Sequence, residues 1–487
     1  MDRTAKFTIV TVLLGVFMGA LDSGIVSPAL SVLNRDLSID FQSVVWVVTL
    51  YTLVYAVSMP LIGKLADRYG RRMIFIIGIL IFGVGSLICG LSHQFWLLLV
   101  GRAVQAVGGG GIMPIANAMI AQTVPKEKRG MALGLVGSMF GIATIIGPTV
   151  GSFLIDQISW RSIFFVNIPI SIIIWFLALR LPKQKTDQHK APLDIAGGLF
   201  LGAAITFLLL GITNIDQKSA LTSLRHINVW GLILLAIIAT LPFIFIEKKA
   251  KDPIVRLPYF KDKNILMTFL ISTITGIGMI STVFLPSFSE VLLKLHTGVG
   301  GYVMTVLAAA SGFAAPIGGM FLDRWGAKRV VVTGFLLGLL GSACLSFATN
   351  GWTMLMIGMI LSGVGIGFTV GTPLNYIILE LVSERDSGVA LSLVSLFRSV
   401  GTTTGPIILA SFLTSRGANG GMGGAHSHRD ISTMPEFVRT MLVNGYHHLY
   451  LAAATIFFIG VVFSIFLRIR NTRTDEKQVQ QKLPIEK

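Results

Sequence analysis

Long apolar stretches alternate with short polar segments along the whole chain. A helix needs about 20 apolar residues to cross the hydrocarbon core of a bilayer. Fourteen stretches of that kind predict helices at residues 7–30, 43–62, 73–91, 95–121, 131–156, 161–181, 193–213, 228–246, 264–293, 301–322, 330–349, 351–379, 388–413 and 446–467. The pattern therefore predicts an all-α membrane protein with fourteen transmembrane helices.

The polar segments between these helices are duplicated. The run from Gly63 to Arg72 returns half a chain length later at Gly319–Arg329, and Gly147-Pro148 is echoed by Gly405-Pro406. Helices 1–6 therefore match helices 9–14, which predicts two pseudo-symmetric six-helix halves with a two-helix insertion between them. Parallel repeats of this kind are typical of carriers, in which the substrate site lies between the halves near the bilayer midplane.

The repeat also suggests how the chain is divided. We predict an N-terminal six-helix half (1–182), an inserted helix pair with polar linkers (183–262), a C-terminal six-helix half (263–470) and a polar tail (471–487). The C-terminal half includes an external loop at 414–445.

Charge is scarce but unevenly placed. Only 13% of the 487 residues are charged and 53% are hydrophobic, whereas soluble proteins carry about 25% charged residues. The net charge of +16 comes mostly from Lys and Arg on the side of the predicted membrane that holds the N-terminus. Because basic residues mark cytoplasmic loops, the excess predicts cytoplasmic termini, and we expect no nucleic-acid partner.

The residues that could bind metals give no pattern. Cys89 and Cys344 lie inside apolar runs, and His426, His428, His447 and His448 have no ligand spacing. We expect no metal, no cofactor and no disulfide framework.

Several motifs resemble those of the major facilitator superfamily, and more narrowly of its fourteen-span drug:proton antiporters. The Gly63–Arg72 loop resembles the signature between spans 2 and 3, and Leu99–Gly108 resembles the span-4 motif around an arginine. Leu21–Val26 resembles the span-1 aspartate motif, although the chain continues with Ser27-Pro28, and Pro28 is expected to bend the end of that span. Four glycines and a proline in span 5 resemble a motif associated with antiporters; they are Gly137, Gly141, Gly147, Pro148 and Gly151.

Asp22 is the deepest carboxylate of any predicted span, about 15 residues or roughly 22 Å along helix 1. Arg102 lies roughly 10 Å into helix 4 from the other side. The resemblance places these spans face to face, so the two side chains are predicted to pair. Charges inside membranes often mark proton paths, and we assign proton coupling to Asp22 and Arg102. A fixed structural ion pair is the alternative.

Two further charges are candidates for the substrate cavity. Arg398 lies near the middle of helix 13 and is expected either to bind an anionic group or to serve packing. Glu290 lies near the external end of helix 9, where a solvated pair with Lys294 is expected and an external recognition site or a second proton site is the alternative. Asp22 itself is a third candidate for substrate binding.

The duplicated loops are interpreted as gates that close the cytoplasmic side. Asp67 and Asp323 stand at helix–loop junctions, where a carboxylate caps a helix N-terminus and pairs with a basic residue. The assigned gating residues are Gly63, Asp67, Arg68, Gly70, Arg71, Arg72, Asp323 and Arg324. Basic loops that only stop translocation are the alternative. The small residues of span 5 are expected to pack closely on a neighbour.

Taken with the resemblance, these features predict a proton-coupled efflux antiporter that exports hydrophobic, cationic drugs or dyes by alternating access. The expected partners are small hydrophobic substrates, protons and membrane lipids, and the expected state is a monomer in a bacterial plasma membrane. An exporter or flippase of one metabolite or lipid-linked molecule is the alternative. We expect no enzyme, because neither a phosphate-binding loop nor a nucleophile–base set is present.

Overall fold

A computed structural model describes residues 2–37, 39–182, 194–216, 220–223, 225–294, 300–348, 352–370, 372–414 and 436–467. Thirteen helices within these residues are long and apolar enough to cross a membrane, and the stretch Ser162–Ala178 is a shorter apolar helix. The predicted fold class, an all-helical membrane protein with fourteen spans, is confirmed.

The first half contains the helices before residue 182. They are α1 (Arg3–Ile25), α2 (Ala29–Asp36), α3 (Phe41–Tyr69), α4 (Arg71–Gly90), α5 (Phe95–Gly110), α6 (Ile112–Thr123), α7 (Lys126–Gln157), α8 (Ser162–Phe165) and α9 (Asn167–Ala178). The inserted pair consists of α10 (Ile195–Thr213) and α12 (Ile227–Lys249), with a short α11 (Ala220–Ser223) between them and a 3-10 turn, η1 (Leu257–Lys261), after them.

The second half repeats the pattern of the first. It contains α13 (Lys263–Ile280), η2 (Ser281–Phe284), α14 (Leu285–Leu293), α15 (Gly300–Trp325), α16 (Ala327–Ser346), α17 (Trp352–Thr369), α18 (Thr372–Leu381), η3 (Glu384–Asp386), α19 (Ser387–Thr414) and α20 (Glu436–Phe466). The fourth span breaks at Gly111 into α5 and α6, and the equivalent span of the second half breaks into α17 and α18.

Some expected boundaries were wrong. Pro28 ends the turn after α1 and starts the separate helix α2, as a residue without a backbone N–H can. The last helix begins at Glu436 rather than at residue 446, so the end of the expected external loop 414–445 is the first part of α20 instead. The rest of the expected loop, residues 415–435, and the tail lie outside the described residues.

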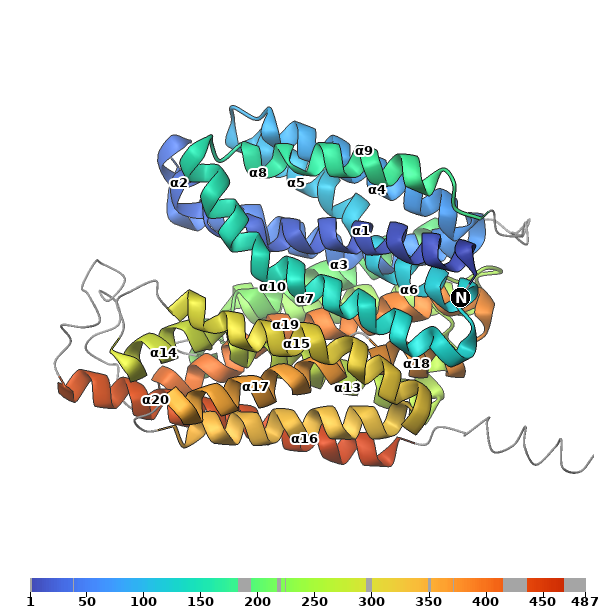
Figure 1. Ribbon diagram of the computed structural model, residues 1–487. Coiled ribbons are helices and arrows are strands. Elements are labelled where there is room, and N and C mark those ends of the chain that lie inside the picture. The colour runs from blue at the N-terminus through green and yellow to red at the C-terminus, as the bar shows by residue number, and fades with distance from the viewer. Residues whose placement is uncertain are drawn as a thin grey trace, which may run out of the picture.

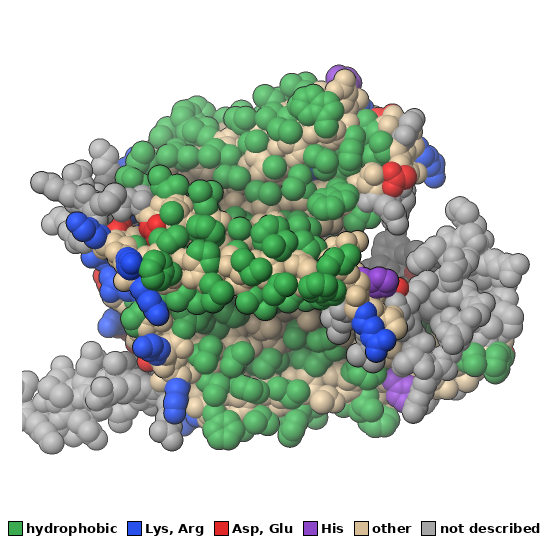
Figure 2. Space-filling view, turned by 180° about the vertical axis from the view of Figure 1, so that it is seen from behind, with side chains coloured by type: hydrophobic (Ala, Val, Ile, Leu, Met, Phe, Trp, Pro, Cys, Tyr) green, Lys and Arg blue, Asp and Glu red, His purple; other side chains and the backbone are tan. Residues whose placement is uncertain are grey.

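Figure 1 shows the two halves as layers, with α1, α4, α5 and α9 in one and α15, α16, α17 and α20 in the other. The halves meet through α7 against α15 and α3 against α19, and the inserted pair packs on α3 through α10. We call the end of the bundle that holds the start of α1 and the turns at Gly70 and Gly326 the basic end. Figure 2 shows a wide band of hydrophobic side chains between the ends, with Lys and Arg gathered toward the basic end at the left.

Candidate functional site

Asp22 is enclosed by hydrogen-bond donors from two other helices of the first half. Its Oδ2 lies 2.7 Å from Arg102 Nη1, and its Oδ1 accepts from Gln105 Nε2 and Asn167 Nδ2, both at 2.9 Å. Asp22 is 0% exposed and Arg102 1%. The pairing expected from the sequence is present, and each carboxylate oxygen has a partner.

Arg102 has its own set of contacts beyond Asp22. Its Nε donates to the carbonyl oxygen of Val47 at 3.1 Å, and its guanidinium lies 3.9 Å from the centre of the Tyr51 ring. These contacts orient the side chain without Asp22. Arg102 therefore has polar and aromatic partners that remain if Asp22 becomes neutral.

Gln105 and Asn167 were missed by sequence reasoning. Gln105 sits one turn after Arg102 on α5, accepts from Arg102 Nη1 at 2.8 Å and donates to Ser86 at 2.7 Å. Asn167 is 0% exposed at the start of α9. A polar residue inside an apolar run was the available signal, but the sequence does not show that it faces Asp22.

Asp67 makes the first of two contacts between the halves at the basic end. Its two oxygens accept from the backbone N–H groups of Gly388 and Val389 in the first turn of α19, both at 3.0 Å. Arg71 Nη2 lies 3.3 Å from Asp67 and also reaches the carbonyl of Glu384. A carboxylate at a helix N-terminus satisfies free N–H groups and complements the positive end of the helix dipole.

Asp323 makes the equivalent contact from the second half. Its Oδ1 and Oδ2 accept from the backbone N–H groups of Gly130 at 2.9 Å and Met131 at 3.1 Å, near the start of α7. The two halves therefore hold each other reciprocally, each through a carboxylate on one and a helix start on the other. The basic end is closed in this structure.

Two glycines permit the close approach at these contacts. A Cβ on Gly63 would lie 2.4 Å from Ser392 Oγ and 2.8 Å from the carbonyl oxygen of Gly388. Gly70 has a φ of 96°, in the region that favours glycine, and forms the turn from α3 into α4.

Three arginines assigned to these gates lie elsewhere. Arg68 Nη1 lies 3.0 Å from Asp252 of the inserted segment, and Arg72 donates to the carbonyl oxygen of Leu179. The side chain of Arg324 is exposed and makes no hydrogen bond or ion pair with any other residue that the structure describes. Arg68 and Arg324 therefore do not partner the two aspartates, because their side chains leave the interface between the halves.

Asp252 brings the inserted segment to the gate. Its carboxylate lies 2.6 Å from Lys64 Nζ, 3.0 Å from Arg68 and 3.8 Å from Arg385 of the second half. Burial by itself opposes ionisation, but hydrogen bonds and charges from these cations outweigh it, so the pKa of Asp252 is lowered from 3.8. The segment after α12 therefore carries an ionised carboxylate against both halves at neutral pH.

The span-5 glycines fall on different neighbours. A Cβ on Gly147 would lie 3.0 Å from Gly24 Cα, and one on Gly151 would lie 2.6 Å from the carbonyl oxygen of Ile25, so both glycines pack on α1. A Cβ on Gly141 would have nothing within 4 Å. A Cβ on Gly137 would lie 3.3 Å from the carbonyl oxygen of Val370 in the second half. Pro148 lies within α7 beside Gly24. The motif joins α7 to α1 on one side and reaches the second half on the other.

Arg398 and Glu290 lie in different settings. Arg398 on α19 is half-buried, its Nη2 lies 3.7 Å from Met113 Sδ of the first half, and no carboxylate of the described residues pairs with it. Glu290 is only 6% exposed, and Lys294 pairs with Glu436 at 3.6 Å. The solvated Glu290–Lys294 pair was therefore wrong, because Lys294 turns away in the left-handed conformation that ends α14.

The described residues contain no group of His, Cys, Asp or Glu side chains that could hold a metal ion. A family model for the Major Facilitator Superfamily matches residues 12–292 and 265–486. The chain belongs to the Major Facilitator Superfamily. Members of this family are membrane transporters rather than enzymes.

The relatives carry different functional names. The chain is 38% identical to the uncharacterized MFS-type transporter YfiU of Bacillus subtilis over 85% of this chain and 81% of the relative. Multidrug resistance protein 3 of B. subtilis is 30% identical over 85% of this chain and 80% of the relative. Riboflavin transporter RibZ of Clostridioides difficile is 29% identical over 94% of this chain and 96% of the relative.

A solved structure supports the fold alone. The crystal structure of the human organic anion transporter MFSD10 (TETRAN) superposes with a TM-score of 0.66 at 12% identity, covering 95% of this chain and 100% of that one. The arrangement of helices is therefore shared with that transporter.

Proposed function

We propose that this chain is a proton-coupled efflux antiporter that exports hydrophobic compounds by alternating access. The observation that carries the proposal is the pairing of a buried carboxylate, Asp22, with Arg102 in one half, together with two breakable carboxylate contacts between the halves. Relatives named as multidrug transporters support the same substrate class.

The proposal includes a direction. Basic residues gather at the end that holds the two gates, and such residues favour the cytoplasm. We therefore place the basic end and both chain termini in the cytoplasm of a bacterium, with the carrier in the plasma membrane. In this orientation the structure corresponds to the state that is closed toward the cytoplasm.

The proton acts on the Asp22 network. A proton from outside neutralises Asp22, which removes the charge attraction to Arg102 while Val47 and Tyr51 continue to hold the guanidinium. The helices α1 and α5 then change their relative positions, and the contacts of Asp67 and Asp323 with the opposite halves open. Release of the proton to the cytoplasm restores the Asp22–Arg102 pair, and a substrate bound in that state leaves on the next cycle.

The charges near the interface between the halves suggest a second candidate function with a different substrate charge. Arg398 is a half-buried cation between the halves without a carboxylate partner among the described residues, whereas Asp22 is neutralised by Arg102. Such a cation favours a substrate with an anionic or electron-rich polar group over a cation. An exporter of one specific metabolite is therefore the second candidate, and the relative RibZ is named as a transporter of one metabolite, riboflavin.

Purified protein in liposomes with an internal pH-sensitive dye tests the main proposal. We would impose a pH gradient and add lipophilic cations, neutral drugs and riboflavin in turn to the wild type, Asp22→Asn and Asp156→Asn. Asp156 is exposed and serves as the matched control. Substrate-triggered proton movement that is lost in Asp22→Asn and kept in Asp156→Asn is the expected result.

Other outcomes separate the candidates. Proton movement that survives in Asp22→Asn would make Asp22 a structural residue and refute its coupling role. A response to riboflavin but to no drug, abolished by Arg398→Gln, would favour the metabolite exporter.

A further inference from the structure

The inserted helix pair has two carboxylates where its helices meet at the basic end. Asp194 precedes α10, and its Oδ1 accepts from the backbone N–H of Gly197 at 2.8 Å. Glu247 is near the end of α12 and is only 4% exposed, and its Oε1 accepts from the backbone N–H of Val255. One oxygen of each group is thus bound by the backbone.

The second oxygen of each group has no hydrogen-bond partner among the described residues. Asp194 Oδ2 and Glu247 Oε2 are both buried and without a hydrogen bond. A Cβ on Gly197 would lie 2.2 Å from the first and 2.9 Å from the second, and the two side chains are within hydrogen-bonding reach of each other. Two acceptors therefore face one small space beside Gly197.

Two ionised carboxylates in such contact repel each other, and a buried acceptor without a donor costs about 1–3 kcal/mol. One proton removes both penalties, because a protonated carboxyl donates to its neighbour. We propose that Asp194 and Glu247 bind one shared proton between Oδ2 and Oε2, which makes the inserted pair a second proton site separate from Asp22.

The cations nearby do not replace this proton. Lys64 and Arg68 on α3 both reach Asp252 rather than the pair. Lys248 and Lys249, which follow Glu247 on α12, are exposed. On α19, which also packs on α10, Arg398 points to Met113. Among the residues that the structure describes, no cation is bound to either of the two acidic groups.

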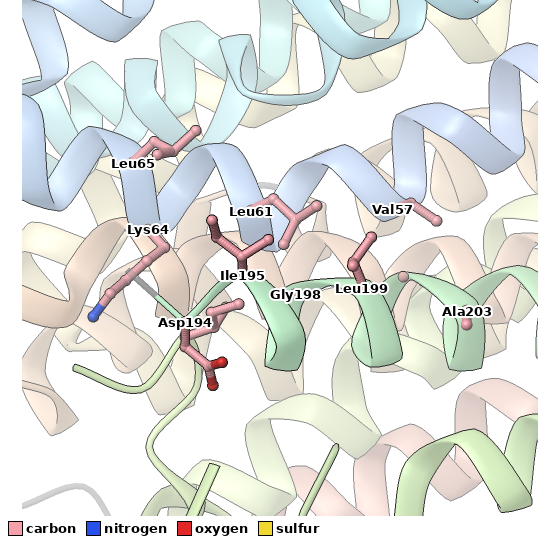
Figure 3. Close-up of a pocket in the computed structure, with 11 residues that line it drawn as sticks. Val57, Leu61, Lys64, Leu65, Asp194, Ile195, Gly198, Leu199 and Ala203 are labelled. Carbon is pink, nitrogen blue, oxygen red and sulfur yellow. The ribbon is translucent and has the colours of Figure 1, made fainter. Parts of the chain in front are cut away.

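The surroundings are apolar on the other side. Figure 3 shows Asp194 and Lys64 at one end of a cavity of about 450 Å³ between α3 and α10, whose remaining wall is formed by side chains such as Leu61 and Leu199. A weakly polar wall raises the cost of a second negative charge. The cavity thereby favours the singly protonated state of the pair.

The proton site is connected to the gate through one short segment. Glu247 accepts a hydrogen bond from the backbone N–H of Val255. Three residues earlier, Asp252 pairs with Lys64 and with Arg68, and Arg68 is adjacent to Asp67 in the chain. Loss of the proton creates two adjacent negative charges and pushes the base of α10 away from α12. The segment between Asp252 and Val255 is then released, so the protonation state is linked to the hold on α3.

A carbodiimide that reacts with protonated carboxyl groups in apolar surroundings tests the proposal. We would label the full-length protein in liposomes with dicyclohexylcarbodiimide over a range of pH and locate the adducts by mass spectrometry. We expect an adduct on Asp194 or Glu247 that falls about tenfold per pH unit above the midpoint of the pair. Asp252, which is ionised, is expected to stay unlabelled.

Two variants distinguish a shared proton from two independent groups. Glu247→Gln donates its amide N–H to Asp194 and leaves that group ionised, so we expect the adduct on Asp194 to disappear as well. Glu127→Gln, at an exposed position at the start of α7, serves as the control and is expected to label as the wild type does. Absence of an adduct on both residues at every pH, or undiminished labelling of Asp194 in Glu247→Gln, would overturn the proposal.

Discussion

The contact of α7 with α15 makes a direct test of alternating access possible. In Gly130→Ala, the added Cβ would lie 2.5 Å from the carbonyl oxygen of Gly319 and 2.6 Å from Asp323 Oδ1, where real Cβ atoms stay at least 3.0 Å away. Because one of these atoms belongs to the backbone of α15, the clash is relieved only when the two helices separate. We expect the variant to shift the carrier away from the state closed at the basic end.

The size of the shift follows from the cost of overpacking. An extra methyl group in a close-packed contact costs about 1–3 kcal/mol. At about 1.4 kcal/mol per tenfold change, the equilibrium between the closed and open states moves about 5- to 150-fold. Alanine also stabilises a helix by about 0.5–1 kcal/mol relative to glycine. Gly141→Ala on the same helix controls for this effect, because a Cβ on Gly141 would have nothing within 4 Å.

Pulsed electron paramagnetic resonance measures the separation of the halves. Spin labels at Lys128→Cys and Arg329→Cys, two exposed positions at the basic end, would be placed in a Cys89→Ala, Cys344→Ala background. We expect a larger fraction of long distances in Gly130→Ala and an unchanged distribution in Gly141→Ala. Equal distributions in the two variants would refute the reasoning, since the clash would then have no conformational consequence.

Two further predictions concern the charges. Arg102→Met leaves Asp22 buried without its cation, so we expect the free energy of unfolding, measured in denaturant, to fall by about 3–5 kcal/mol. The double variant with Asp22→Asn should recover part of this loss. An equal loss in the double variant would contradict the pairing. Asp252→Asn should speed hydrogen exchange of residues 250–256 at neutral pH. Because the pKa of Asp252 is lowered from 3.8, its ion pairs hold the segment above that pH and are lost as the pH falls through the lowered pKa. The difference between variant and wild type should therefore vanish at strongly acid pH; a difference that persists there would exclude the ionised carboxylate as its cause.

The sequence predicted that two carboxylates of the repeated motif cap helix N-termini. Asp67 and Asp323 occupy equivalent positions of the duplicated loops, and each reaches the start of a helix in the opposite half. Asp22 and Arg102 were paired from their depths in two spans and from the family resemblance that places these spans face to face, and the distance of 2.7 Å agrees. Because charge inside a membrane is costly, a rare buried charge is expected to pair with an opposite charge at a similar depth.

Contacts made by the inserted segment could not be predicted in the same way. Asp252 lies far from Lys64 and Arg385 along the chain, and nothing in its local sequence indicates three cations around it. Arg68 was assigned to Asp67 because the two are adjacent, yet it lies against Asp252. The direction of a side chain at a helix end depends on what packs there.

The sequence by itself determined the number of spans, the two-fold repeat and the positions of the buried charges, because bilayer thickness and the cost of charge in hydrocarbon act on each helix separately. Only the tertiary structure decided which groups share a site: Gln105 and Asn167 at Asp22, and the facing oxygens of Asp194 and Glu247. These groups come together through helix packing, and rotation of one helix by a quarter turn would separate them without changing any hydrophobic pattern.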